Sequence, residues 1–278
     1  MEENSPTSTN QSHYKTLKQQ LKTNNMTPNF DEIKIHCSSL GKILTNPKSK
    51  ADIEEGNLSA TAKSHLIEVY AKELYDFRKE LNNKYITKGN EVEQEGIEAL
   101  SLHLKFPMEK NEETFSSEYF VGTPDIVTNN LIIDLKSSFD WITFLNNIPS
   151  ELDPMYVAQV NGYLDLLGYD TGYIAYVLLD TPESIRNKEK FYLLSSMDVI
   201  SEESPSFVKA WEEKEKNMIF SNHPIEERIL LFEVKKDQEL LDKAKQKVIK
   251  ARQFLEEFYY SHRNFNKQSL QNILQTIK

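Results

Sequence analysis

Cysteine is almost absent from this sequence of 278 residues, which contains only Cys37. A single thiol cannot close an intrachain disulfide, so a disulfide-stapled secreted scaffold is excluded. One thiol also cannot supply the several thiolates that an intrachain iron–sulfur cluster needs. We therefore expect Cys37 to be a small buried apolar side chain.

Long apolar runs are also absent. No stretch reaches the roughly 18 consecutive apolar residues that indicate a membrane-spanning helix, and the amino terminus lacks the apolar segment of a signal peptide. Residues 1–30 are instead rich in Asn, Ser, Thr, Gln and Lys, which predicts a mostly disordered polar leader with a short helix near 14–21. We expect a cytoplasmic protein without membrane contact. His36, His65 and His103 have no spacing that indicates a metal site.

Charge is unevenly distributed along the chain. The formal net charge is −10, yet residues 1–50 carry a balance of +3 and residues 241–278 a balance of +5, which leaves −18 between them. A net negative charge argues against a nucleic-acid partner. An acidic centre between basic ends, however, fits a metal site flanked by segments that contact phosphates. Solvated basic helix faces would explain the C-terminal charge equally well.

The central part of the chain predicts a β-hairpin, with two short apolar strands on either side of the turn at 128–130. Asp125 stands at the start of the first strand, and Asp134 and Lys136 stand two apart on the second. Because side chains alternate along a strand, Asp134 and Lys136 should face the same side. Two carboxylates on an apolar hairpin are costly unless their charge is offset, and a hard divalent cation with oxygen ligands would offset it.

Helical periodicity predicts a first long helix at 60–82 and a second at 87–103. The apolar stripe of the first should belong to the core: Leu66, Val69, Tyr70, Leu74, Phe77 and Leu81. In the second, Glu93 follows Gly89 by four residues. The alternative is that Glu91, Glu93 and Glu95 are ordinary acidic residues of a first helical turn, where the helix dipole favours them.

A third helix at 155–167 places Gln159 and Tyr163 four residues apart, and hence on one face. A buried tyrosine with a hydrogen-bonded glutamine would give the same pattern. The helix precedes an apolar strand at 172–179, which we expect to pair in parallel with the strand at 131–136. The other elements that we expect are strands at 33–37 and 227–234 and helices at 38–44, 139–146, 205–220 and 237–260.

These patterns predict an α/β protein with a central mixed β-sheet flanked by helices and with helical additions at both ends. After the leader we expect a core at 31–180, an α/β extension packed on it at 181–260, and a polar tail that frays at 261–278. Residues 183–196 should be irregular or form short elements. The basic residues of the last helix should be exposed: Lys243, Lys247, Lys250 and Arg252.

Pro124-Asp125, followed by Asp134-Leu135-Lys136, resembles the PD-(D/E)XK signature of metal-dependent nucleases. The signature is loose alone, but three further segments match in the expected order. Gly89 and Glu93 resemble the glycine and helical glutamate of the lambda-exonuclease group. Gln159 and Tyr163 resemble the Q-x-x-x-Y motif of RecB-type and lambda-type nucleases, and the segment 37–43 resembles the opening of YqaJ-like phage exonucleases.

The resemblance implies a restriction-endonuclease-like core and a metal-dependent DNA exonuclease of phage type, which resects duplex ends for recombination or repair. It implies one Mg²⁺ or Mn²⁺ held by Asp125, Asp134, the backbone carbonyl of Leu135 and Glu93, with Glu91 as the alternative to Glu93. Lys136 would orient the attacking water. Gln159 and Tyr163 would position the scissile strand.

DNA is the partner that the resemblance implies, and a single-strand annealing or recombination protein is a second one. Lambda-type relatives form rings, which leaves a homo-oligomer open. Two other functions also stay open: an endonuclease on the same fold, of restriction or branched-DNA type, and a non-catalytic DNA-binding or partner-docking module. The intact Asp125, Asp134 and Lys136 argue against the non-catalytic module.

Overall fold

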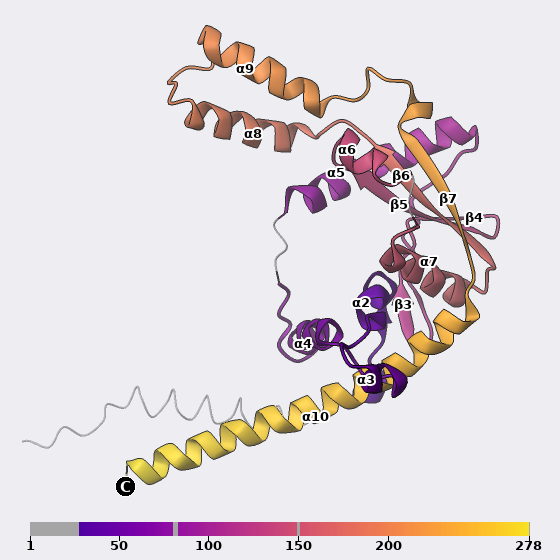
Figure 1. The fold of residues 1–278 in the computed structure, drawn as a ribbon, viewed down its shortest axis with the longest axis vertical. Helices are drawn as coiled ribbons and strands as arrows, with labels where there is room; N and C mark the ends of the chain where they lie inside the picture. Colours follow the sequence, from indigo (N-terminus) through magenta and orange to yellow (C-terminus); the bar gives the residue numbers. More distant parts are fainter. Residues whose placement is uncertain (1–27, 80–82, 149–150, 278) are drawn as a thin grey trace, which may run out of the picture.

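The computed structural model describes residues 28–79, 83–148 and 151–277 (Figure 1). Its centre is a four-stranded sheet in the order β4-β5-β6-β7. The strands span Ile126–Thr128, Leu131–Ser138, Thr171–Leu178 and Ile229–Lys235. The pairs β4–β5 and β6–β7 are antiparallel, whereas β5 and β6 are parallel. The predicted mixed sheet is confirmed, and its fourth strand comes from the C-terminal third of the chain.

The β4–β5 hairpin turns at Asn129 and Asn130, whose φ angles of 44° and 63° are left-handed. Asparagine tolerates this conformation better than most residues, and paired positive φ angles suit the twist of a two-residue hairpin. The turn sets the register in which Ile126 lies opposite Ile133. Because β4 begins at Ile126, the edge of β5 that faces β4 is free of it beyond Ile133, and Asp125 lies just beside that edge.

A smaller sheet has the order β1-β3-β2, with strands at Ile35–His36, Phe120–Gly122 and Phe115–Ser116. The strand predicted at 33–37 is therefore shorter than expected. The chain continues from it into the 3₁₀ turn η2 (Cys37–Ser39) and helix α2 (Leu40–Leu44). Cys37 is fully buried, as predicted.

Helix α7 (Pro154–Leu167) lies between the two sheets and carries the predicted Gln-x-x-x-Tyr face. Asp153 caps its first turn, Pro154 fits the first helical position, and Gly168 ends it with a φ of 70°. A Cβ at Gly162 would come within 2.6 Å of Leu40 and 2.8 Å of the Cys37 Sγ. Glycine is thus required where α7 approaches η2 and α2.

The sheet separates two hydrophobic clusters. One contains Ile132 and Ile174 together with α7 and the C-terminal helix. The other contains Ile133 and Leu135 together with Val92 of helix α5 (Lys84–Leu104). Alternation along β5 therefore decides which side chains face α7 and which face α5.

Helix α4 (Ala60–Tyr75) is shorter than the helix predicted at 60–82, because Asp76 takes a left-handed φ of 49° and ends it. Phe77, predicted to be core, is 62% exposed. Leu81 lies outside the described residues, as does the leader helix predicted near 14–21. Three further short elements are η1 (Phe30–Glu32), α3 (Lys50–Glu54) and α6 (Trp141–Leu145), the last of which contacts β5 and β6.

The prediction that 183–196 is irregular is wrong. It forms helix α8 (Glu183–Ser196), which lies beside α9 (Pro205–Glu215) at one end of the molecule (Figure 1). Ion pairs join the two helices, including Lys214 to Glu189 at 2.7 Å. Ile185 is the one buried residue of α8, so the helix gives little apolar periodicity for the sequence to reveal. The 3₁₀ turns η3 (Lys216–Met218) and η4 (Ile225–Glu227) lead from α9 to β7.

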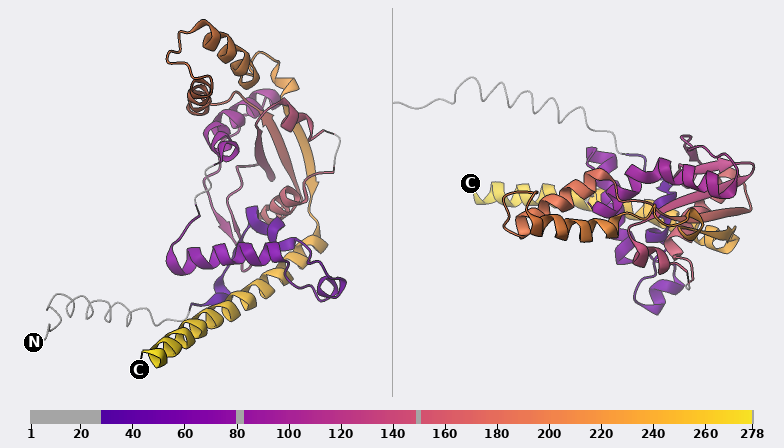
Figure 2. Two further views of the ribbon diagram at one scale, coloured as in Figure 1. Left: turned by 60° about the vertical axis from the view of Figure 1, so that its left-hand side comes forward. Right: turned by 90° about the horizontal axis from the view of Figure 1, so that it is seen from above.

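The last helix, α10 (Gln238–Thr276), is longer than predicted. The segment expected to fray continues the helix, and its C-terminal half extends away from the rest of the fold (Figure 2). The prediction that Lys247 and Arg252 are exposed is also wrong, since both are buried. Lys247 donates to the Asn57 carbonyl, and Arg252 donates to the carbonyls of Ile33 and Glu118.

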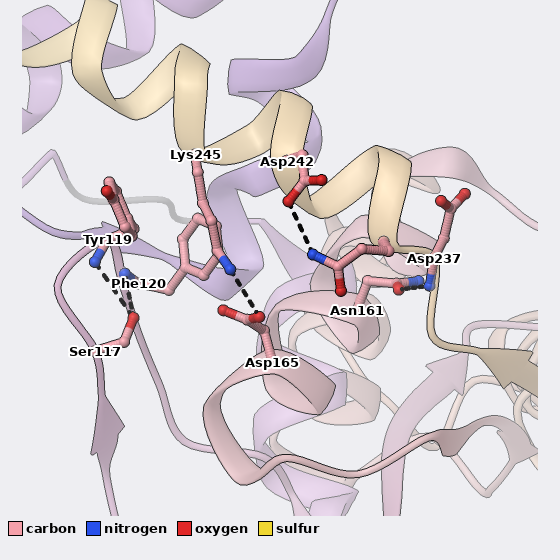
Figure 3. Close-up of polar contacts among 9 residues, drawn as sticks. Ser117, Tyr119, Phe120, Asn161, Asp165, Asp237, Asp242 and Lys245 are labelled. Atoms are coloured by element: carbon pink, nitrogen blue, oxygen red, sulfur yellow. Dashed lines mark hydrogen bonds and ion pairs between the residues drawn. The ribbon is translucent and has the colours of Figure 1, made fainter.

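Polar contacts fix α10 to α7 (Figure 3). The Asp237 amide donates to Asn161 Oδ1 at 2.7 Å, and Lys245 pairs with Asp165 at 2.9 Å. Asn161 is fully buried, so this hydrogen bond satisfies a group that would otherwise be costly. The helix that carries Gln159 is thereby held between the sheet and α10.

The described helices include none with the length and apolar character needed to cross a membrane. The division of the chain at residues 180 and 260 remains a prediction. β7 pairs with β6, and Val248 of α10 lies in the same cluster as Ile132 of β5.

Candidate active site

β5 brings Asp134 and Lys136 to one side of the sheet, as their spacing predicts. The Lys136 Nζ lies 2.6 Å from Asp134 Oδ2. Asp134 is fully buried, while the Lys136 side chain keeps 19% of its surface exposed. The Asp134 carboxylate is therefore held inside the protein, and the Lys136 ammonium that pairs with it lies at the surface of the site.

α7 completes this cluster from the facing side. Gln159 Nε2 donates to Asp134 Oδ1 at 2.9 Å and to the Tyr163 hydroxyl at 2.9 Å. Lys136 Nζ in turn donates to Gln159 Oε1 at 3.3 Å. A primary amide offers both donors and an acceptor, so a single glutamine can hold the carboxylate, the ammonium and the phenol together.

Asp125 joins the cluster from the start of β4. Its Oδ2 accepts a hydrogen bond of 2.7 Å from the Leu135 amide. In a strand the amide and carbonyl of one residue point to the same edge, so the Leu135 carbonyl also faces the side where Asp125 lies. Two carboxylates and a backbone oxygen thus converge beside the start of β4.

The electrostatics of the pair show an excess of negative charge. Burial, and then the charge of Asp134, raise the pKa of Asp125 to about 7 against the opposing effect of the Leu135 amide. Burial also raises the pKa of Asp134, although Lys136 counteracts this. Burial alone would lower the pKa of Lys136, but Asp134 and Asp125 raise it. One lysine does not offset both carboxylates.

Glu93, on α5, approaches the same place. It lines a hollow of about 340 Å³ together with Asp125, Leu135 and Lys136, and its charge contributes to the raised pKa of Asp125. Glu93 is ion-paired with Lys110 at 3.1 Å.

The alternative residue, Glu91, is engaged elsewhere, because the Ser184 hydroxyl donates to its carboxylate at 2.6 Å. The geometry therefore favours Glu93 over Glu91. Gly89 lines the hollow as well, and a Cβ there would meet no atom within 4 Å. Packing does not require glycine at this position, so its effect is to leave the hollow open.

The donor set suits a hard cation. Among the described residues, no three His, Cys, Asp or Glu side chains are arranged as a ready-made metal site. Asp125, Asp134 and Glu93 nevertheless offer oxygen ligands of the type that Mg²⁺ prefers, and their negative charge is only partly balanced. Binding would require Glu93 to exchange Lys110 for the cation.

Sequence reasoning missed Tyr156. The Lys136 Nζ lies 4.7 Å from the centre of its ring, a distance at which the cation and the ring attract each other. Tyr156 precedes Gln159 by three residues, so extending the Gln159–Tyr163 face by one turn would have found it. The roles predicted for the six site residues remain predictions, although the structure gathers all six in one region.

Comparison with solved structures gives strong matches. A phage-related exonuclease from Haemophilus somnus 129PT superposes with a TM-score of 0.65 and 29% identity, covering 83% of this chain and 97% of the other. An alkaline exonuclease from Laribacter hongkongensis, LHK-Exo, superposes with a TM-score of 0.57 and 13% identity, covering 86% of this chain and 96% of the other. Its complex with dAMP gives a TM-score of 0.53, 14% identity and coverages of 86% and 94%.

Comparisons of the sequence with protein-family models and with curated proteins give no match. The structural matches confirm both the predicted resemblance to phage-type exonucleases and the restriction-endonuclease-like α/β fold.

Proposed function

We propose that this chain is a metal-dependent exonuclease that hydrolyses phosphodiester bonds at the ends of duplex DNA. One observation carries the proposal: the buried Asp134 is held between Lys136 and Gln159, beside Asp125, at the wall of an open hollow. The similarity to the Haemophilus somnus exonuclease extends over nearly all of that protein and supports the same reaction class.

Asp125, Asp134, the Leu135 carbonyl and Glu93 would hold Mg²⁺ or Mn²⁺. When bound, the cation would lower the pKa of a coordinated water and offset the charge of the phosphate. The other catalytic groups would be side chains of the protein. The Lys136 ammonium, which is kept protonated by Asp134, would orient the attacking water and stabilise the charge that develops on the phosphate oxygens.

Gln159 would act on Lys136 and Asp134 at once. Because it accepts from the ammonium and donates to the carboxylate, it fixes the distance between the two groups before DNA binds. Tyr163 receives the second Gln159 N–H and restricts the rotation of the amide. A preorganised cluster of this kind needs little rearrangement at the moment of reaction.

We further propose, from the same resemblance, that the enzyme acts in DNA recombination or repair in the cytoplasm. A single-strand annealing or recombination protein would be its partner, and a homo-oligomer is compatible with this function.

The test compares linear and covalently closed circular duplexes, end-labelled where possible, with Mg²⁺ and with EDTA. We expect Mg²⁺-dependent release of nucleotides from linear duplex and no nicking of circles. Asp134→Asn should abolish release, whereas the exposed Lys235→Met, on the same sheet, should leave it unchanged. Cutting of intact circles would establish the endonuclease alternative instead. DNA binding that survives Asp134→Asn, with no cleavage by the wild type, would establish the non-catalytic module.

A further inference from the structure

A second hollow, of about 270 Å³, adjoins the first, and the two share Lys136, Ser137 and Tyr156. The second hollow lies toward the carboxyl end of β5. None of the carboxylates proposed to hold the metal lines it. Its remaining wall comes from five elements or their flanks: Tyr85, Ser138, Phe139, Thr143, Asn147, Asp153 and Tyr176.

Four aromatic side chains form part of this wall, between polar groups. The rings of Tyr85 and Phe139 lie 4.7 Å apart between centres, and those of Tyr156 and Tyr176 lie 6.3 Å apart. Tyr85 is exposed even though it belongs to a helix that packs on the core. Of the four rings, Tyr85 is the exposed one, whereas Phe139 and Tyr156 are half-buried and Tyr176 is buried. An exposed ring beside a polar cavity is suited to stacking on a nucleobase, because every base offers a π-face.

The polar groups of the wall are mainly uncharged. Ser137 Oγ is buried and has no hydrogen-bond partner among the described residues. Asp153, the one acidic residue here, already accepts from the Met155 amide at 2.8 Å. Apart from Lys136, at the border with the first hollow, and Asp153, the lining side chains are uncharged, which suits a neutral ligand.

The two hollows therefore differ in the chemistry that they accept, and Lys136 stands at their junction. The hollow with Asp125 and Glu93 suits a cation and the phosphate that it would neutralise. The hollow with Tyr85 and Phe139 suits a planar, uncharged group. In a nucleotide the sugar joins a charged phosphate to a planar base. A DNA strand that passes Lys136 would therefore place the phosphate in the first hollow and the base in the second.

We propose that the second hollow is a nucleoside subsite, which stacks the base attached to the scissile phosphate on Tyr85 and Phe139. The proposal rests on the proposed function. Because stacking does not depend on which base is present, this subsite accepts all four nucleosides, as an enzyme that digests DNA of any sequence requires.

The experiment pairs variants with substrates that lack one base. The substrates are end-labelled linear duplexes, either intact or with an abasic nucleotide on one or the other side of the first scissile phosphate. We expect the wild type to cleave one abasic substrate about tenfold more slowly than the intact duplex, in the range that stacking on an aromatic residue gives. Tyr85→Ala and Phe139→Ala should slow cleavage of the intact duplex but not of the abasic one. The ratio of the two cleavage rates should then be close to one.

Phe191→Ala is the matched control, because Phe191 is an exposed aromatic residue on α8. It should keep the wild-type ratio. Phe139 also packs on Lys88, so the exposed Tyr85 provides the variant whose folding is least affected. The proposal is overturned if the wild type cleaves intact and abasic duplexes at equal rates, or if Tyr85→Ala slows both equally.

A binding measurement separates this proposal from the proposed function. If the wild type cleaves no duplex, the nuclease assignment fails, and binding of deoxyadenosine by ligand-observed NMR then decides on the subsite. Binding that Tyr85→Ala weakens and Phe191→Ala preserves supports the subsite. Absence of binding to the wild type overturns it.

Discussion

Lys136 and Lys88 are both withdrawn from solvent, but their surroundings differ. Lys136 contacts the carboxylate of Asp134, and the two acidic residues of the cluster raise its pKa. Lys88, on α5, is 1% exposed and donates to the Phe139 carbonyl at 2.9 Å. Burial lowers the pKa of Lys88 to about 8, and the more distant carboxylates only partly oppose this.

The difference between the two lysines shows how burial and a charged partner each change the pKa of a lysine. Burial makes any charge costly, and a carboxylate in direct contact reverses the direction of the pKa shift. Lys88 has the aromatic faces of Phe139 and Phe220 and a carbonyl instead. Its contacts hold α5, which carries Glu93, against the segment after β5. Lys136 thus belongs to the proposed chemistry, and Lys88 to the framework that positions it.

Replacing the two lysines by the same residue gives the largest contrast. Lys136→Met should reduce the rate of cleavage at saturating DNA by about 10²–10³-fold, the range seen when a group that stabilises transition-state charge is removed. Lys88→Met should change that rate only slightly. Single-turnover kinetics on end-labelled duplex would measure both, and equal losses in the two variants would contradict the distinction.

The lowered pKa of Lys88 should also make the free energy of unfolding depend on pH. Below pH 8 the amine is protonated in both the folded and unfolded states. Between about 8 and 10.5 the unfolded chain retains the proton that the folded protein has lost, so the free energy of unfolding rises with pH. The rise should approach about 3 kcal/mol.

Urea unfolding of the wild type and of Lys88→Met across that window would measure the effect. The difference between the two proteins removes the contribution of other titrating groups. A difference that stays constant with pH would contradict the lowered pKa.

Arg252 is a third buried cation. Within the part of the chain that the structure describes, its hydrogen bonds go to backbone carbonyls only. It donates to the carbonyls of Ile33 at 3.0 Å and Glu118 at 2.6 Å. Arg252→Met should lower the free energy of unfolding by about 2 kcal/mol, because both carbonyls lose a charged donor. Lys243→Met, at an exposed position of the same helix, should change it by less than about 0.5 kcal/mol. Denaturant titration would measure both.

The smallest expected effect is on the cleavage rate, from substitutions of the glutamates on α5. Glu93→Gln should reduce cleavage about tenfold, the scale expected when a supporting metal ligand is weakened. Glu91→Gln, whose parent residue bonds Ser184 instead, should remain within about twofold of the wild type. Titration of activity with Mg²⁺ would show a raised metal requirement for Glu93→Gln alone. The opposite ranking would make Glu91 the site residue.

The parts of the fold that could be predicted are those set by short-range rules. Alternation along β5 puts Asp134 and Lys136 together, and helical spacing puts Gln159 and Tyr163 together. Both relations hold within one element, so the rest of the fold does not alter them. The hairpin turn at Asn129 and Asn130 is local in the same sense.

The missed features depend on contacts between distant segments. Lys247 and Arg252 were expected to be exposed because lysine and arginine usually are, yet each finds a backbone carbonyl from the N-terminal part of the chain. Lys88 is buried for a similar reason, through Phe139. Helix α8 is joined to α9 by ion pairs and buries Ile185 alone of its own residues, so little apolar periodicity marks it. No sequence pattern signals such partners.

The burial of Cys37 has a practical consequence. Its Sγ is enclosed where α7 and β3 approach, so that a Cβ added at Gly122 or Gly162 would come within 2.9 Å of it, and burial raises the pKa of the thiol. The native protein therefore offers maleimide reagents no reactive thiolate. A cysteine introduced at an exposed position such as Phe191 would take a fluorophore at one defined place, which would allow the binding of single molecules to DNA to be tested.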